Sequence, residues 1–121
     1  MTPAEMRTRT KQFALRILKL AESLPRSISG RTLANQIARS GTSVAANYRA
    51  AGKARSKAEF IAKFGIAEEE ADETQFWLEM IIESQLVKPS LIQPLHQEAR
   101  EVTAIIAASR ISASKQKQIG N

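Results

Sequence analysis

The chain has 121 residues, 43% of them hydrophobic, with 5 Gly, 4 Pro and no Cys. This length suits one domain with one core, and the lack of cysteine excludes a disulfide scaffold, a thiolate metal site and a cysteine nucleophile. The longest apolar run, residues 104–108, is far shorter than the roughly 20 residues that span a bilayer. The sequence does not begin like a signal peptide. We therefore expect a soluble, cytoplasmic protein.

Charge is distributed unevenly along the chain. The net charge is +6, but residues 1–57 hold 12 Lys and Arg against 2 Glu, a local charge of +10. Residues 58–101 hold 3 basic against 10 acidic residues, a charge of −7, and the remainder carries +3. We expect the acidic segment to pair with the basic half, within one chain or between copies. The positive surplus makes a polyanion such as nucleic acid the expected electrostatic partner.

The first two predicted helices cover residues 3–24 and 31–54. Thr2, Pro3 and Glu5 form a capping signature at the start of the first. Apolar residues then recur at helical spacing, at Met6, Phe13, Ile17, Leu20 and Leu24 in the first helix and at Leu33, Ile37, Val44 and Ala51 in the second. Gly41 lies inside the second helix, where a glycine costs about 1 kcal/mol relative to alanine but permits close contact between helices.

The third and fourth predicted helices cover residues 57–87 and 91–111. Ser56 and Glu59 give the third a capping signature, and Ser90 and Gln93 give one to the fourth. The inner stripe of the third helix is predicted to be Phe60, Phe64, Ala67, Ala71, Leu78 and Ile82. Residues 113–121 are expected to form a polar, frayed tail.

These patterns predict an all-α protein. No stretch alternates apolar and polar residues as a strand would, and no Asn-Gly or Asp-Gly hairpin signal is present. Four amphipathic helices with short connectors predict an up-down-up-down antiparallel four-helix bundle over residues 1–112.

The first two helices carry basic residues on faces that avoid their apolar stripes. Such faces are often merely solvated, but two adjacent basic helices form a continuous patch for phosphates. Tyr48 is the one aromatic candidate for base stacking in the basic half of the chain. Recognition of the nucleic acid's backbone or shape is therefore favoured over stacking on its bases. The predicted nucleic-acid-binding residues are Arg7, Lys11, Arg16, Lys19, Arg31, Arg39, Arg49 and Lys53.

A polar ridge lies between the apolar and basic strips of the second helix, formed by Gln36, Ser40, Ser43 and Asn47. Polar residues at a helix seam usually fix register or helix pairing. No base capable of activating a serine accompanies them, so we do not expect catalysis at this ridge.

The third helix has a second apolar surface, predicted to point away from its inner stripe. A helix that is apolar on two sides needs a second cover. We interpret this surface as a subunit interface; alternatively, Trp77 packs under the loop 87–91. The predicted interface residues are Ile66, Phe76, Trp77, Met80 and Ile81.

Nothing in the sequence indicates catalysis. The acidic run of residues 68–73 is the one dense charge cluster, but a carboxylate-bridged metal site needs glutamates from several helices and Glu-x-x-His pairs. The single histidine, His96, has Gln93 three positions before it. A Gly-rich phosphate loop and a nucleophile–base pair are also missing. We expect no enzyme activity, no metal and no cofactor.

Four motifs of the second and third predicted helices stand out in combination. They are Gln36-x-x-Arg39-Ser40-x-x-Ser43-x-x-x-Asn47, Arg55-Ser56-x-x-Glu59-Phe60, Ile66-Ala67 with Glu69–Glu73, and Trp77-Leu78-Glu79. In these motifs the chain resembles the 23S rRNA-intervening sequence protein family of four-helix bundles, and the resemblance covers about residues 10–110. It implies a small bacterial bundle that assembles into a homopentameric ring. A related accessory protein of diversity-generating retroelements is basic and associates with nucleic acid and a reverse transcriptase.

Two functions follow from these observations. The first is a non-enzymatic homo-oligomer that binds RNA or other nucleic acid through its first two helices. The alternative is a protein-interaction scaffold that docks a partner protein without touching nucleic acid.

Overall fold

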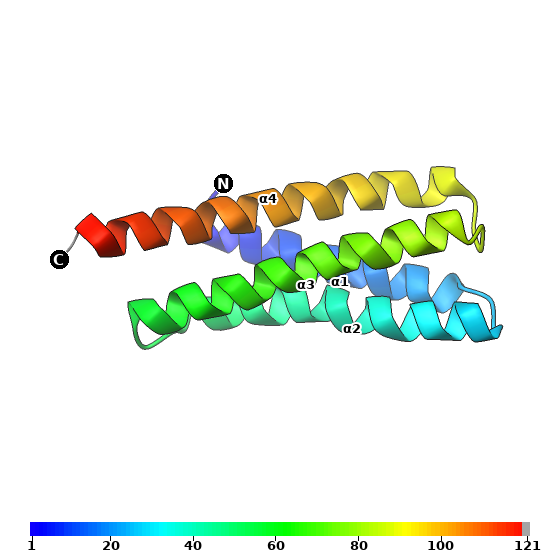
Figure 1. The fold of residues 1–121 in the computed structure, drawn as a ribbon, viewed down its shortest axis with the longest axis horizontal. Coiled ribbons are helices and arrows are strands. Elements are labelled where there is room, and N and C mark those ends of the chain that lie inside the picture. The colour runs from blue at the N-terminus through cyan, green and yellow to red at the C-terminus, as the bar shows by residue number, and fades with distance from the viewer. Residues whose placement is uncertain (120–121) are drawn as a thin grey trace.

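The computed structural model describes residues 1–119, with side chains as far as residue 115, and this part of the chain contains helices but no strand. The four helices are α1 (Pro3–Ser23), α2 (Ile28–Ala51), α3 (Lys57–Glu83) and α4 (Pro89–Ile119). The connectors α1–α2 and α3–α4 lie at one end of the molecule, and the connector α2–α3 lies at the other (Figure 1). None of the described helices is long and apolar enough to cross a membrane.

Each helix packs on the next in sequence, and α1 also contacts α4, so the four helices enclose one core. The apolar residues predicted for α1 and α2 are buried there, Phe13, Ile17, Ile37 and Val44 among them, except Leu20, which is only partly buried. From α4, Ile92, Val102 and Ile106 complete the core. One continuous cluster therefore stabilises the bundle.

The capping signals fix three helix starts. The Thr2 hydroxyl accepts from the Glu5 amide at 3.1 Å while the Glu5 carboxylate accepts from the Thr2 amide at 3.0 Å, a capping box. The Ser56 hydroxyl accepts from the Glu59 amide at 3.1 Å. The second helix begins earlier than residue 31 because Ser27 caps it, accepting from the Gly30 amide at 3.0 Å.

The predicted end of α3 and the predicted tail were both wrong. The third helix ends at Glu83 rather than at residue 87, and Gln85 just beyond it is left-handed with φ 58°. The fourth helix continues to Ile119 through most of the predicted tail 113–121, because no Gly or Pro interrupts the chain after Pro94 until residue 120. The last two residues of that tail lie outside the described residues.

The buried stripe of α3 also differs from the predicted one. It consists of Phe64, Ala67, Ala71, Thr74, Leu78 and Ile81, which follow each other at alternating steps of three and four. The polar residue Thr74 continues the helical period, so Ile81 rather than the predicted Ile82 takes the next core position. Ile81 is fully buried and Ile82 only half-buried. The assignment of Ile81 to an outward surface is therefore wrong.

Candidate nucleic-acid interface

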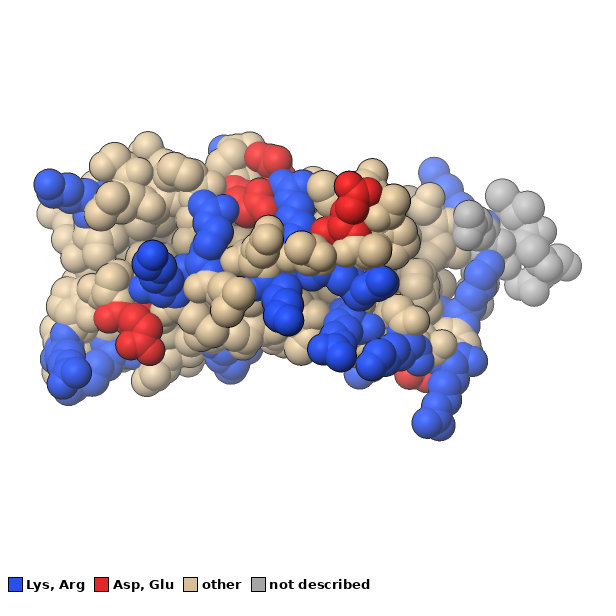
Figure 2. All heavy atoms as spheres, turned by 180° about the vertical axis from the view of Figure 1, so that it is seen from behind, with Lys and Arg blue, Asp and Glu red and all other residues tan. Residues whose placement is uncertain are grey.

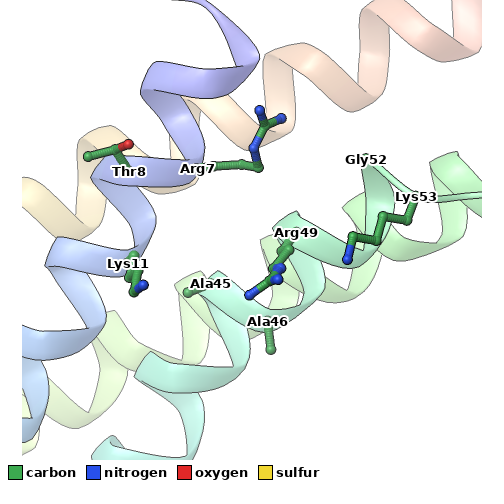
Figure 3. Close-up of a pocket in the computed structure, with 8 residues that line it drawn as sticks. All are labelled: Arg7, Thr8, Lys11, Ala45, Ala46, Arg49, Gly52 and Lys53. Atoms are coloured by element: carbon green, nitrogen blue, oxygen red, sulfur yellow. The ribbon is translucent and has the colours of Figure 1, made fainter.

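Four basic residues gather around one groove between α1 and α2. Arg7 and Lys11 come from α1, Arg49 from α2, and Lys53 from the connector that follows it (Figure 3). The groove has a volume of about 690 Å³. These are four of the eight basic residues predicted from the sequence, and the fold brings them to one place.

The local sequence explains the shape of the groove. Arg7 and Lys11 lie four positions apart and so share one face of α1, and Arg49 and Lys53 have the same spacing. The wall between them consists of small residues, Ala45, Ala46 and Gly52, which leave the space open. Long cationic side chains therefore surround an open hollow whose wall consists of methyl groups and backbone.

Within the described part of the chain, no acidic residue lines the groove. These four cations form no ion pair with any of the described residues. Their positive potential is therefore not cancelled locally and remains available to an anionic ligand.

The acidic residues pair with other arginines, across helices. Arg9 on α1 donates two hydrogen bonds to Glu98 on α4, at 2.7 and 2.8 Å, and a third to Glu101 at 3.0 Å. Arg110 on α4 donates to Glu68 on α3 at 2.5 Å. The expected pairing between acidic and basic segments thus exists within one chain, and it uses arginines outside the groove.

Arg39 pairs in the same way although it was predicted to bind nucleic acid. Its guanidinium contacts Glu70 at 3.1 Å and also Glu73. Part of its charge is neutralised, so Arg39 differs from the four groove residues.

The remaining predicted cations lie elsewhere on the surface. Arg16 and Lys19 are exposed farther along α1. Arg31 lines a separate hollow of about 270 Å³ near the α1–α2 connector, together with Arg26 and Glu22. Seen from the side on which α1 lies, Lys and Arg side chains are spread along the length of the molecule while acidic ones occupy a few positions (Figure 2).

One member of the polar ridge of α2 joins two helices, and the other members form hydrogen bonds within α2. The fully buried hydroxyls of Ser40 and Thr74 lie 2.8 Å apart across the α2–α3 contact. Asn47 donates to the backbone oxygen and hydroxyl of Ser43 within α2, at 2.9 and 3.0 Å. Gln36 accepts from Arg39 at 3.4 Å. Thr74 was missed because its polarity hid its place in the helical period.

The outer face of α3 carries exposed apolar side chains. Ile66, Phe76 and Met80 are 39%, 50% and 40% exposed. Trp77 is half-buried, packs edge-on against Phe76 with centroids 4.9 Å apart, and donates its indole N–H to Glu73 at 2.9 Å. Four of the five predicted interface residues therefore reach the surface, with Ile81 as the exception.

A second exposed apolar face lies on α1, where Leu15 and Leu18 are 57% and 38% exposed. Neither leucine belongs to the interface predicted from the sequence. The signal was present, because both residues fall between members of the buried stripe and have no role in the core.

In the described part of the chain, no three or more His, Cys, Asp or Glu side chains lie close enough together to hold a metal ion. His96 lies 3.4 Å from Glu79 as a single surface pair.

Comparisons with known proteins agree with this architecture. The model of the family described as 23S rRNA-intervening sequence protein matches residues 4–108. Among solved structures, the chain is similar to the crystal structure of a protein of unknown function from the S23 ribosomal protein family of Bacteroides thetaiotaomicron. The two chains are 32% identical with a TM-score of 0.84, and the match covers 91% of this chain and 98% of that one. A search of curated proteins finds no match.

Proposed function

We propose that this chain, which belongs to the 23S rRNA-intervening sequence protein family, is a non-enzymatic, homo-oligomeric bundle that binds RNA or other nucleic acid in the groove between α1 and α2. The observation that carries the proposal is the set of four cations around that groove, which have no ion-pair partners among the described residues. Phosphates are the anions that a row of such side chains suits best.

The separation of paired and unpaired arginines supports this proposal. A basic surface whose purpose is internal neutralisation would place its charges next to the acidic residues of α3 and α4, as Arg9 and Arg110 do. Arg7 and Arg49 instead face a groove that no carboxylate of the described residues lines. Cations held close together repel one another, so their arrangement is most favourable when an anion lies between them.

We further propose that the subunit is an up-down-up-down antiparallel bundle and that copies associate head to tail, forming the five-membered ring that the family resemblance implies. The alternating ends of the connectors support the topology (Figure 1). In the described chain α1 and α3 do not contact each other, so they lie diagonally and their apolar faces point away from each other. Contacts between two different faces lead to rings or filaments.

The charges beside these two faces are complementary. On α1, the exposed Lys11 and Lys19 lie one turn before and one turn after Leu15, and the exposed Glu22 lies one turn after Leu18, so cations outnumber carboxylates beside this face. On α3, the exposed acidic residues Asp72, Glu79 and Glu83 surround Phe76. Opposite charges at the rim of an apolar contact orient the partners. The α1 face of one copy therefore suits the α3 face of the next.

Binding of a labelled rRNA fragment at moderate salt tests the proposed function. The double variant Arg49→Gln/Lys53→Gln is expected to bind at least about tenfold more weakly than the wild type, because two phosphate contacts are lost. The matched control Arg26→Gln/Lys88→Gln removes the same charge from connectors at the other end of the molecule and is expected to bind within about twofold of wild type. Equal losses in both variants would refute a localised site.

A second candidate function is a scaffold that docks a partner protein. It is favoured by Ile28 and Leu91, which are 81% and 70% exposed and begin α2 and α4 at the same end of the bundle (Figure 1). If this is the function, the wild type fails to bind nucleic acid, and Ile28→Asp/Leu91→Asp abolishes binding of the partner protein while Arg49→Gln/Lys53→Gln preserves it.

A further inference from the structure

A second, smaller hollow adjoins the basic groove. It has a volume of about 190 Å³ and draws residues from all four helices, among them Met6, Tyr48, Phe60, Ile105 and Ser109. Arg7 and Gly52 line both this hollow and the groove. The two spaces therefore meet at Arg7.

The walls of this hollow are largely apolar and aromatic. Phe64 packs edge-on against both Phe60 and Tyr48, with ring centroids 4.6 and 5.4 Å apart. These rings are held by the core beneath them, since Phe64 and Tyr48 are both buried. A ligand that enters the hollow thus meets fixed hydrocarbon surfaces.

Two hydroxyl groups supply polarity to the hollow. The Ser109 hydroxyl donates to the backbone oxygen of Ile105 at 3.0 Å and keeps its lone pairs available. The Tyr48 hydroxyl forms no hydrogen bond to the described residues. Every fully buried polar side-chain atom among those residues has a hydrogen-bond partner. The Tyr48 hydroxyl is therefore not fully buried and retains access to solvent. It is free to donate to a ligand or to accept from it.

Arg7 links the two spaces electrostatically. Burial raises the pKa of Tyr48, and the positive charge of Arg7 opposes that rise, which indicates that the guanidinium lies within Coulombic reach of the ring. An Arg7 nitrogen also lies 4.0 Å from the point where a Cβ on Gly52 would be. An anion bound at Arg7 would accordingly lie at the mouth of the apolar hollow.

We propose that this hollow accepts one unpaired base of a nucleic-acid strand whose phosphates lie in the basic groove. The inference rests on the proposed function and narrows it to single strands or bulged nucleotides. A base has flat apolar faces and a polar edge, which match the aromatic walls and the two hydroxyls of the hollow. The phosphate of the same nucleotide is separated from the base by one sugar, and Arg7 lies at the corresponding position between the hollow and the groove. A base in a duplex is stacked and paired, and so cannot enter.

This proposal differs from the expectation drawn from the sequence, in which few aromatics favoured backbone or shape recognition. Phe60 and Phe64 belong to α3, outside the two basic helices. The fold brings them beside Tyr48 at the end of the groove.

The test compares binding of a labelled single-stranded RNA, the same sequence as DNA, the same RNA in a duplex, and the single strand with abasic sites. The wild type is expected to bind the intact single strand about tenfold more tightly than the abasic strand and the duplex, the usual magnitude for one base on an aromatic surface. The RNA and DNA strands distinguish whether the sugar contributes. These measurements need no protein variant.

Filling the hollow provides the second measurement. Ser109→Met places a longer side chain in the hollow and is expected to lower affinity for the intact single strand about tenfold without changing duplex binding. Ala108→Met, on the exposed side of α4, is the matched control and should bind as the wild type does.

Two sets of results distinguish the base-binding hollow from the basic groove. Equal wild-type affinity for intact, abasic and duplex ligands, all lost in Arg49→Gln/Lys53→Gln, would overturn the base-binding hollow and leave the basic groove standing. Affinity that survives Arg49→Gln/Lys53→Gln, or no binding of any of these ligands, would overturn both.

Discussion

Gly41 of α2 lies directly against Ile17 of α1, so that a Cβ at Gly41 would be 2.7 Å from Ile17 Cγ2 and 3.0 Å from its Cβ. Ile17 is fully buried and branched at Cβ, so it has no room to withdraw. Overpacking of this kind costs about 1–3 kcal/mol, which exceeds the roughly 1 kcal/mol that alanine gains in helix propensity. We expect Gly41→Ala to lower the free energy of unfolding, measured by urea denaturation.

Gly65 of α3 is the matched control, because a Cβ there meets nothing within 4 Å. Gly65→Ala is expected to raise the free energy of unfolding by up to about 1 kcal/mol. The two substitutions are chemically identical and should act with opposite signs. Stabilisation by Gly41→Ala would show that α1 and α2 are not packed this closely.

The Arg9 ion pairs between α1 and α4 predict a dependence of stability on pH. Hydrogen bonds from Gln97 and then Arg9 hold the pKa of Glu101 below its usual value. A carboxyl with a lowered folded pKa contributes stability above its unfolded pKa, near 4.3, and loses that contribution as the pH falls through the folded pKa. Arg9→Gln is expected to lower the free energy of unfolding at neutral pH by about 1 kcal/mol, and this deficit should shrink below about pH 4.

Arg100→Gln is the control for Arg9, since Arg100 contacts Gln97 but forms no ion pair among the described residues. Its effect on stability should be small and independent of pH. A deficit in Arg9→Gln that persists unchanged in acid would mean that the arginine acts through packing rather than through its charge.

Tyr48 is the one tyrosine of the chain, so its ionisation can be followed by ultraviolet absorbance. Burial raises its pKa and Arg7 opposes the rise, so Arg7→Gln is expected to move the pKa further upward. A tyrosine with a raised folded pKa contributes stability below its unfolded pKa, near 10, and that contribution is lost as the pH rises through the folded pKa. Lys19→Gln, remote from the ring, should leave the titration unchanged, and a shift as large as that of Arg7→Gln would contradict the proximity of Arg7.

Mixing two variants tests the proposed head-to-tail contact. Leu15→Asp disrupts the α1 face and Phe76→Asp the α3 face, so each alone is expected to remain monomeric by light scattering. An equimolar mixture keeps one intact face on each variant and should yield heterodimers that do not grow further. If like faces met instead, at least one of the two variants would associate with itself when alone, and the mixture would form no heterodimer.

The helices and most of the core follow from the sequence because amphipathic spacing and capping residues are local signals. The predicted start of α2 was too late because the sequence does not single out Ser27 as the residue that caps this helix. The predicted inner stripe of α3 was wrong at Thr74, because the burial of this hydroxyl depends on a partner hydroxyl from α2.

The candidate site was predictable only in part. The faces of Arg7, Lys11, Arg49 and Lys53 could be assigned, but which arginines pair with acids depends on contacts across helices, as Arg39 shows. The hollow beside Tyr48 joins residues from four helices, and no periodicity within one helix indicates it.

The salt dependence of nucleic-acid binding tests the basic groove most directly. Each phosphate contact to a single strand contributes about 0.7 to the slope of log association constant against log salt concentration. We expect Arg49→Gln/Lys53→Gln to bind single-stranded RNA with a slope shallower than that of the wild type by about 1.4, and Arg26→Gln/Lys88→Gln to retain the wild-type slope. Identical slopes for the wild type and both variants, or binding that does not respond to salt, would contradict the assignment of the groove to phosphates.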